Sequence, residues 1–151
     1  MELITYLVKP SQRFAVKVVH DFGTSLNPLI DQGQMEGGIV QGIGWLTLEE
    51  LLYSEHGDLL TGGLGDYNVP DIYSAPSEIT VHFLEGSSNT PGIFNSKAIG
   101  EPPFMYGIGT FQTLFSAMRA FRPDLPQEAG ITAPLTPERV LVSLYGIDPL
   151  P

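Results

Sequence analysis

The chain has 151 residues, 42% of them hydrophobic and 16% charged, which is the composition of one globular domain rather than of a disordered segment. Its formal net charge of −10 argues against binding to nucleic acid or to an anionic membrane surface, and no apolar run is long enough to cross a bilayer. Because it contains no cysteine and its N-terminus lacks the pattern of a secretory signal, we expect a cytoplasmic protein without disulfides or a cysteine-ligated iron–sulfur cluster.

The first half of the chain predicts a strand, a helix and a hairpin in that order. Apolar and polar residues alternate over 14–22, which predicts the strand. Asn27 and Pro28 are favourable as the cap and the first residue of a helix that we expect to end near Trp45. Two short runs around a polar turn predict a β-hairpin over 48–61, and a loop follows it.

The second half predicts another strand and two further helices. Alternation over 78–84 predicts the strand, and a polar turn region follows over 85–92. Apolar side chains at spacings of three and four predict an amphipathic, core-packed helix over 104–121. Thr136 and Pro137 begin a short C-terminal helix.

These elements together predict an α+β fold. We expect a mixed or antiparallel sheet packed against a few helices, chiefly those that begin at Pro28 and Phe104. No convincing domain boundary interrupts the chain, so residues 1–151 are expected to form a single domain.

The three histidines and one pair of glutamates are weak candidates for a metal-binding or catalytic site. The spacing of His20, His56 and His82 is not that of metal ligands, and no metal site is predicted. His20 lies on the apolar face of the first strand and is expected to be a hydrogen-bonded core residue. The adjacent Glu49 and Glu50 are expected to lie on a solvated face.

The helix that begins at Pro28 is unusually rich in glycine. Its glycines are Gly33, Gly37, Gly38, Gly42 and Gly44. Each costs a helix interior about 0.8–1 kcal/mol relative to alanine, so other interactions must stabilise the helix. The spacing of Gln34, Gly38 and Gln41 puts them on one face, where two carboxamides flank bare backbone that a polar ligand could approach. The alternative is that the glycines admit a neighbouring helix or strand.

A second unusual feature is a glutamate enclosed by glycine and proline. Glu101 lies between Gly100 and the pair Pro102 and Pro103, just ahead of the helix over 104–121. Pro102 disfavours helical dihedral angles at Glu101, so we expect an extended backbone there. The helix N-terminus favours an ionised carboxylate. A rigid, ionised carboxylate suits a general base, and the alternative is a helix-capping glutamate.

Both features occur within an ordered set of motifs that resembles the molybdenum hydroxylases, the family of xanthine dehydrogenase and aldehyde oxidase. The motifs are DFGTSLNP (21–28), GQMEG (33–37), QGIG (41–44), EEL (49–51), DYNVP (66–70), SKAIGEPP (96–103) and PLTPERVL (134–141). The similarity covers roughly residues 15–145. It implies that the chain is the C-terminal part of a molybdenum-cofactor-binding domain.

The resemblance also implies a reaction and a set of site residues. Glu101 would be the general base in the hydroxylation of a purine, an N-heterocycle or an aldehyde, taking the proton of the attacking hydroxyl while hydride passes to the molybdenum centre. A molybdopterin-type molybdenum cofactor would lie against the glycine-rich helix and the turn before Glu101. The residues implied in holding it are Gln34, Gly33, Gly37, Gly38, Gln41, Ser96, Lys97 and Gly100.

Family members also carry an upstream half of the molybdenum domain, iron–sulfur domains and usually a flavin domain, and none of these fits within this chain. We expect such partners, and a small-molecule substrate, in an assembled oxidoreductase. The chain itself is then a detached subunit, a truncated product or an expressed fragment, with neither turnover nor stably bound cofactor on its own. The alternative function is a non-catalytic, stand-alone domain that acts as an assembly or interaction module, including as a homo-oligomer.

Overall fold

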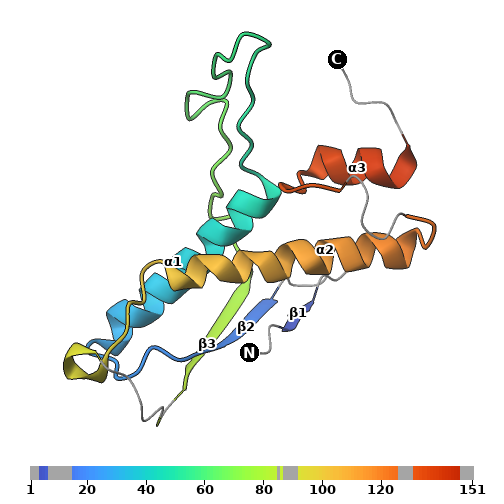
Figure 1. Ribbon diagram of the computed structural model, residues 1–151. Coiled ribbons are helices and arrows are strands. Elements are labelled where there is room, and N and C mark those ends of the chain that lie inside the picture. Colours follow the sequence, from blue (N-terminus) through green and yellow to red (C-terminus); the bar gives the residue numbers. More distant parts are fainter. Residues whose placement is uncertain (1–3, 7–14, 85, 87–91, 126–130, 147–151) are drawn as a thin grey trace.

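A computed structural model describes residues 4–6, 15–84, 86, 92–125 and 131–146 (Figure 1). The elements in chain order are β1 Ile4–Tyr6, β2 Ala15–His20, α1 Pro28–Thr47, β3 Glu78–Phe83, η1 Ile93–Asn95, η2 Pro102–Tyr106, α2 Gly107–Phe121 and α3 Pro137–Tyr145. The predicted α+β fold is confirmed. Residue 14 of the first predicted strand and most of the predicted turn region over 85–92 lie outside the described residues.

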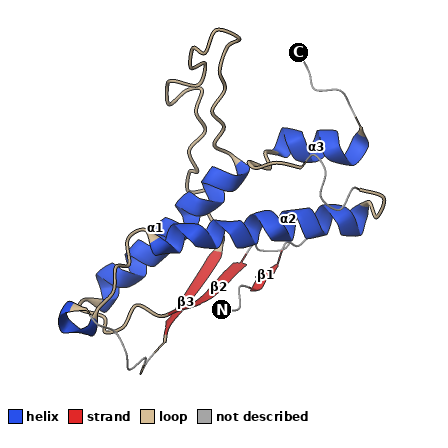
Figure 2. Cartoon of the chain, viewed as in Figure 1, coloured by secondary structure: helices blue, strands red, loops and turns tan. Residues whose placement is uncertain are grey.

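The sheet has three strands in the order β1-β2-β3 and is mixed (Figure 2). Strand β2 pairs antiparallel with the edge strand β1 and parallel with β3, where Val16 faces Ile79 and Val18 faces Val81. The antiparallel alternative is therefore wrong for the pair that forms the main part of the sheet. A parallel pair needs a long crossover connection, and α1 with the segment that follows it supplies one.

Helix α1 forms despite its glycines because it is well capped and well packed. The Asn27 side chain accepts a hydrogen bond from the Ile30 N–H, and Pro28 takes the first helical position, as predicted. One face of α1 packs on the sheet. The main core cluster comprises Val16, Val18, Met35, Ile39, Ile43 and Tyr106, with Ile79, Val81, Phe83 and Ile99 packed around it. Burial of this face offsets the poor helix propensity of the glycines.

Residues 48–77, which we call the arm, leave the end of α1 and project away from the helices and the sheet before the chain returns to β3 (Figure 1). The predicted hairpin is present only as a short ladder, with one bridge between Tyr53 and Leu59. Gly57 closes its turn at a φ of 87°, a value that favours glycine. Many large apolar side chains of the arm are exposed: Leu51, Leu52, Tyr53, Leu59, Leu60, Leu64, Val69, Ile72 and Tyr73.

The predicted helix over 104–121 begins later than expected. The chain first forms the 3₁₀ turn η2, and α2 follows it directly and crosses α1 (Figures 1 and 2). Met118 is buried, but Ile108 and Phe121 are 45% and 67% exposed, so the apolar stripe is only partly in the core. Among the described residues, no helix has the length and apolar character needed to span a membrane.

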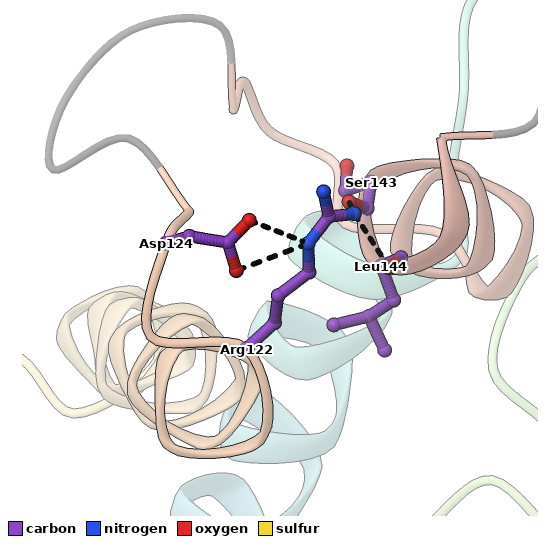
Figure 3. A network of polar contacts seen from close by, with 4 residues as sticks. All are labelled: Arg122, Asp124, Ser143 and Leu144. Carbon is purple, nitrogen blue, oxygen red and sulfur yellow. Dashed lines mark hydrogen bonds and ion pairs between the residues drawn. The ribbon is translucent and has the colours of Figure 1, made fainter.

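Helix α3 packs against α2 through a second apolar cluster that includes Met118, Leu125 and Leu135. It begins at the predicted cap, where the Thr136 hydroxyl accepts a hydrogen bond from the Arg139 N–H. Its C-terminal end is held by Arg122 (Figure 3). The Arg122 guanidinium donates to the Leu144 carbonyl at 2.7 Å and pairs with Asp124 at 3.2 Å. A cation at the last carbonyls of a helix is favourable for the helix dipole.

Candidate functional site

Glu101 lies at the start of the η2 turn with its carboxylate exposed. Its backbone is helical, at φ −87° and ψ −40°, so the predicted extended conformation is wrong. The Glu101 carbonyl accepts a hydrogen bond from the Phe104 N–H at 3.1 Å, which closes the turn across both prolines and offsets the local preference imposed by Pro102. The Glu101 side chain makes no capping bond, and no hydrogen bond or ion pair of its carboxylate is found among the described residues. The capping alternative is therefore not what the structure contains.

A cavity of about 620 Å³ opens beside this carboxylate. Its walls combine α1, the turn before Glu101 and η2. The lining residues are Gln41, Ala98, Gly100, Glu101, Pro102, Phe104 and Met105. The fold therefore brings Glu101 and Gly100 together with Gln41, which lies 60 positions earlier in the chain. A carboxylate beside a carboxamide and bare backbone can accept a proton and hold a polar heterocycle.

The glycines of α1 divide into those that pack closely against another segment, which are Gly38, Gly42 and Gly44, and those with open space beside them, which are Gly33 and Gly37. Gly38 and Gly42 are buried, and a Cβ on Gly38 would lie 2.8 Å from the Pro103 Cβ, while one on Gly42 would overlap the Phe104 carbonyl. For these two the packing alternative holds, because they admit η2. Gly33 and Gly37 are exposed, and a Cβ on either would meet no atom within 4 Å. The open backbone therefore lies in the first half of α1.

Gln34 is not brought to the cavity. Its side chain is exposed and is not among the residues that line the space beside Glu101. Of the two carboxamides predicted to share a face, the structure places only Gln41 with Glu101.

Ser96 and Lys97 anchor the start of the turn to the end of β2. Ser96 forms an isolated bridge with Gly23, and the Lys97 N–H donates to the Phe22 carbonyl at 2.7 Å. The Lys97 ammonium pairs with Asp21 at 2.8 Å. Neither residue lines the cavity beside Glu101. They fix the path of the chain that leads to Gly100.

A second cavity, of about 680 Å³, shares the lining residues Pro102 and Met105 with the first. It is lined by Val19, His20, Asp21, Leu84, Pro102, Met105 and Tyr106. His20 is half-buried and its Nδ1 lies 2.6 Å from the Tyr106 hydroxyl, which confirms the prediction of a hydrogen-bonded histidine. Tyr106 was not singled out in the sequence, although an aromatic residue at the start of the apolar stripe over 104–121 was a signal that could have identified it.

The expectation of a solvated face for Glu49 and Glu50 is wrong. The Glu49 Oε2 accepts a hydrogen bond from the Tyr67 hydroxyl, which raises the pKa of Tyr67, and its Oε1 is buried without a partner among the described residues. Glu50 forms an ion pair with Arg139 of α3. Both carboxylates join segments distant in sequence, and a single local stretch gives no signal of such pairing.

Comparison with known proteins places these features in a family context. Residues 13–76 match the family described as Molybdopterin cofactor-binding domain. The chain is 40% identical over 144 residues to xanthine dehydrogenase 1 of Arabidopsis thaliana, covering 87% of this chain and 10% of that protein. It is also 40% identical over 125 residues to aldehyde oxidase 1 of Bos taurus, covering 82% of this chain and 9% of that protein.

The fold is shared with a solved enzyme. Quinoline 2-oxidoreductase from Pseudomonas putida 86 superimposes with a TM-score of 0.71 at 34% identity, covering 87% of this chain and 16% of that chain. The present chain thus spans about a tenth of the length of the curated relatives it matches.

Proposed function

The chain is a homologue of the molybdenum-cofactor-binding domain of the xanthine dehydrogenase and aldehyde oxidase family, and on that premise we propose that it forms part of a molybdenum hydroxylase in which Glu101 is the general base. Residues 1–151 would then be one partial cofactor-binding domain. The proposed substrates are purines, N-heterocycles or aldehydes, which share an electron-poor carbon bound to hydrogen.

The observation that supports this proposal most strongly is the environment of the Glu101 side chain. Its carboxylate is free of capping bonds and lines a cavity together with Gln41 and Gly100. The backbone that bears it is held by two prolines and a closed turn. A general base needs this combination, because it must be held in place and yet have no partner that competes for the proton.

The cavity beside Glu101 and the open first half of α1 together offer groups that fit a pterin-type cofactor. The open backbone at Gly33 and Gly37 would allow a flat ligand to approach α1, and the carboxamides of Gln34 and Gln41 can both donate to and accept from a heterocycle. When bound, the molybdenum cofactor supplies two-electron oxidation of the substrate. Glu101 accepts the proton that hydroxylation releases, and Gln41 helps to hold the group beside it.

Glu101→Gln tests the role of the base in the assembled enzyme. A general base contributes about 10²–10⁴-fold to rate, so we expect kcat to fall by that factor while the molybdenum content stays near normal. The matched control is Glu55→Gln, which makes the same change at an exposed turn of the arm and should leave turnover unchanged. Near-normal turnover in Glu101→Gln would contradict the assignment of Glu101 as the general base.

A second candidate function has support from the exposed arm. A non-catalytic domain that docks to other chains would use such apolar surface, and the remaining part of the molybdenum domain and iron–sulfur or flavin portions are the proposed partners. Metal analysis and an activity assay on the purified chain separate it from a self-sufficient enzyme. We expect neither bound molybdenum nor turnover from the chain alone.

A further inference from the structure

The end of strand β2 contacts the segment that carries Glu101 at two points. Asp21 pairs with Lys97, before Glu101 in the chain, at 2.8 Å. His20 contacts Tyr106, after Glu101 in the chain, through a hydrogen bond of 2.6 Å. Two consecutive residues of one strand end therefore hold both flanks of the turn.

The contact between His20 and Tyr106 is the more enclosed of the two. Their rings meet edge to face with centroids 5.7 Å apart, and the His20 ring also stacks on Phe22 at 6.0 Å. Tyr106 is 8% exposed. Burial lowers the pKa of His20 and raises the pKa of Tyr106, which favours the neutral form of both groups, and the imidazole tautomer decides which of the two donates the hydrogen bond.

Helix α1 supports the same turn from the other side, but by contact alone. Gly38 packs against Pro103, and Gly42 packs against Phe104 and Gly107. This apolar packing keeps η2 close to α1, but it is non-directional and does not by itself fix the orientation of the turn. The hydroxyl of Tyr106 is the polar group of η2 that ties the turn back to the sheet.

We propose that His20 and Tyr106 are positioning residues, whose hydrogen bond fixes η2 and thereby the direction of the Glu101 carboxylate. This inference rests on the proposed function of Glu101. Neither residue lines the cavity beside Glu101, so any effect on the reaction must pass through η2.

Hydrogen exchange of the full purified chain tests the contact without any cofactor. Tyr106→Phe removes only the hydroxyl, and His20→Leu removes its hydrogen-bonding partner. We expect the amides over 97–107 to exchange about tenfold faster in both variants, since a hydrogen bond to an enclosed partner is lost. The matched controls are Tyr73→Phe and His82→Leu, both at exposed positions, which should leave exchange unchanged. Unchanged exchange over 97–107 in Tyr106→Phe would overturn the proposal.

Kinetics of the assembled enzyme test the positioning role itself. Misplacement of a catalytic group slows the chemical step, so we expect Tyr106→Phe to lower kcat about tenfold with KM changed less than twofold. His20→Asn keeps a carboxamide that can donate or accept a hydrogen bond close to the position of Nδ1, and it should restore most of the kcat lost in His20→Leu. A normal kcat in Tyr106→Phe, or no recovery in His20→Asn, contradicts the proposal. Failure of the base assignment is recognised separately, by turnover in Glu101→Gln.

Discussion

His20, which is half-buried and hydrogen-bonded to Tyr106, makes the folded state of this protein sensitive to acid. Desolvation lowers the pKa of His20 below its ordinary value of 6.5, an effect opposed by Asp21 and reinforced by Lys97. The unfolded chain therefore takes up the proton at higher pH than the folded chain does. The contribution to the free energy of unfolding is complete above pH 6.5 and is lost as the pH falls through the pKa of the folded state.

His20→Asn removes this titration. We expect the difference in free energy of unfolding between the wild-type chain and the variant to shrink between pH 7.5 and pH 5.5, measured by urea unfolding in steps of pH. His82→Asn at an exposed position of β3 is the control, and its difference from the wild type should stay constant. A constant difference for His20→Asn would contradict the assignment.

The environment of Glu101 could be predicted only in part from its sequence neighbours. The sequence indicated a carboxylate held by Gly100 and the two prolines, and the structure has it there. Its extended backbone was the wrong expectation, because the preference imposed by Pro102 is weaker than the hydrogen bond to Phe104 together with the packing of Pro103 on Gly38. The packing of Pro103 involves Gly38 of α1 and could not be inferred from the neighbours of Glu101.

At the scale of the elements, α1 contains glycines with opposite roles. Gly37→Ala should raise the free energy of unfolding by up to about 1 kcal/mol, because it improves helix propensity at a position with open space. Gly42→Ala should lower it by about 1–3 kcal/mol, because its Cβ would overlap the Phe104 carbonyl and push η2 away.

Urea unfolding of the purified chain measures both changes. Equal effects of the two substitutions would mean that Gly37 and Gly42 are interchangeable, which would contradict the close contact at Gly42 and the open space at Gly37. In the assembled enzyme, Gly37→Ala should lower molybdenum content if the open half of α1 holds the cofactor, and Glu55→Gln again serves as control.

The main elements were predictable because their signals are local. The cap at Asn27, the alternation within β2 and the cap at Thr136 each place an element within a few residues of where it lies. The division of the glycines was not predictable, since it depends on which part of α1 meets η2. The parallel pairing of β2 with β3 was equally beyond local patterns, because alternation does not encode strand direction.

At the scale of the whole molecule, the arm leaves the chain with apolar surface to cover. Leu64, Ile72 and Tyr73 are 84%, 83% and 92% exposed. We expect the purified chain to self-associate, so that light scattering gives a mass that rises with concentration above the 16.4 kDa of one chain. Leu64→Lys and Ile72→Lys should reduce this association, whereas Leu29→Lys at an exposed position of α1 should not. A mass of one chain at all concentrations would contradict this expectation.

The arm also determines how proteases can cut the molecule. No lysine or arginine lies between Lys17 and Lys97, so the arm offers trypsin no cleavage site despite its exposure. Its exposed leucine and tyrosine side chains are instead substrates for chymotrypsin. Brief digestion with the two enzymes therefore distinguishes an arm that is inaccessible to proteases from one that merely lacks the residues a protease recognises. Trypsin should leave residues 18–97, which include α1, the arm and β3, in one piece, while chymotrypsin should cut within the arm unless another chain covers it.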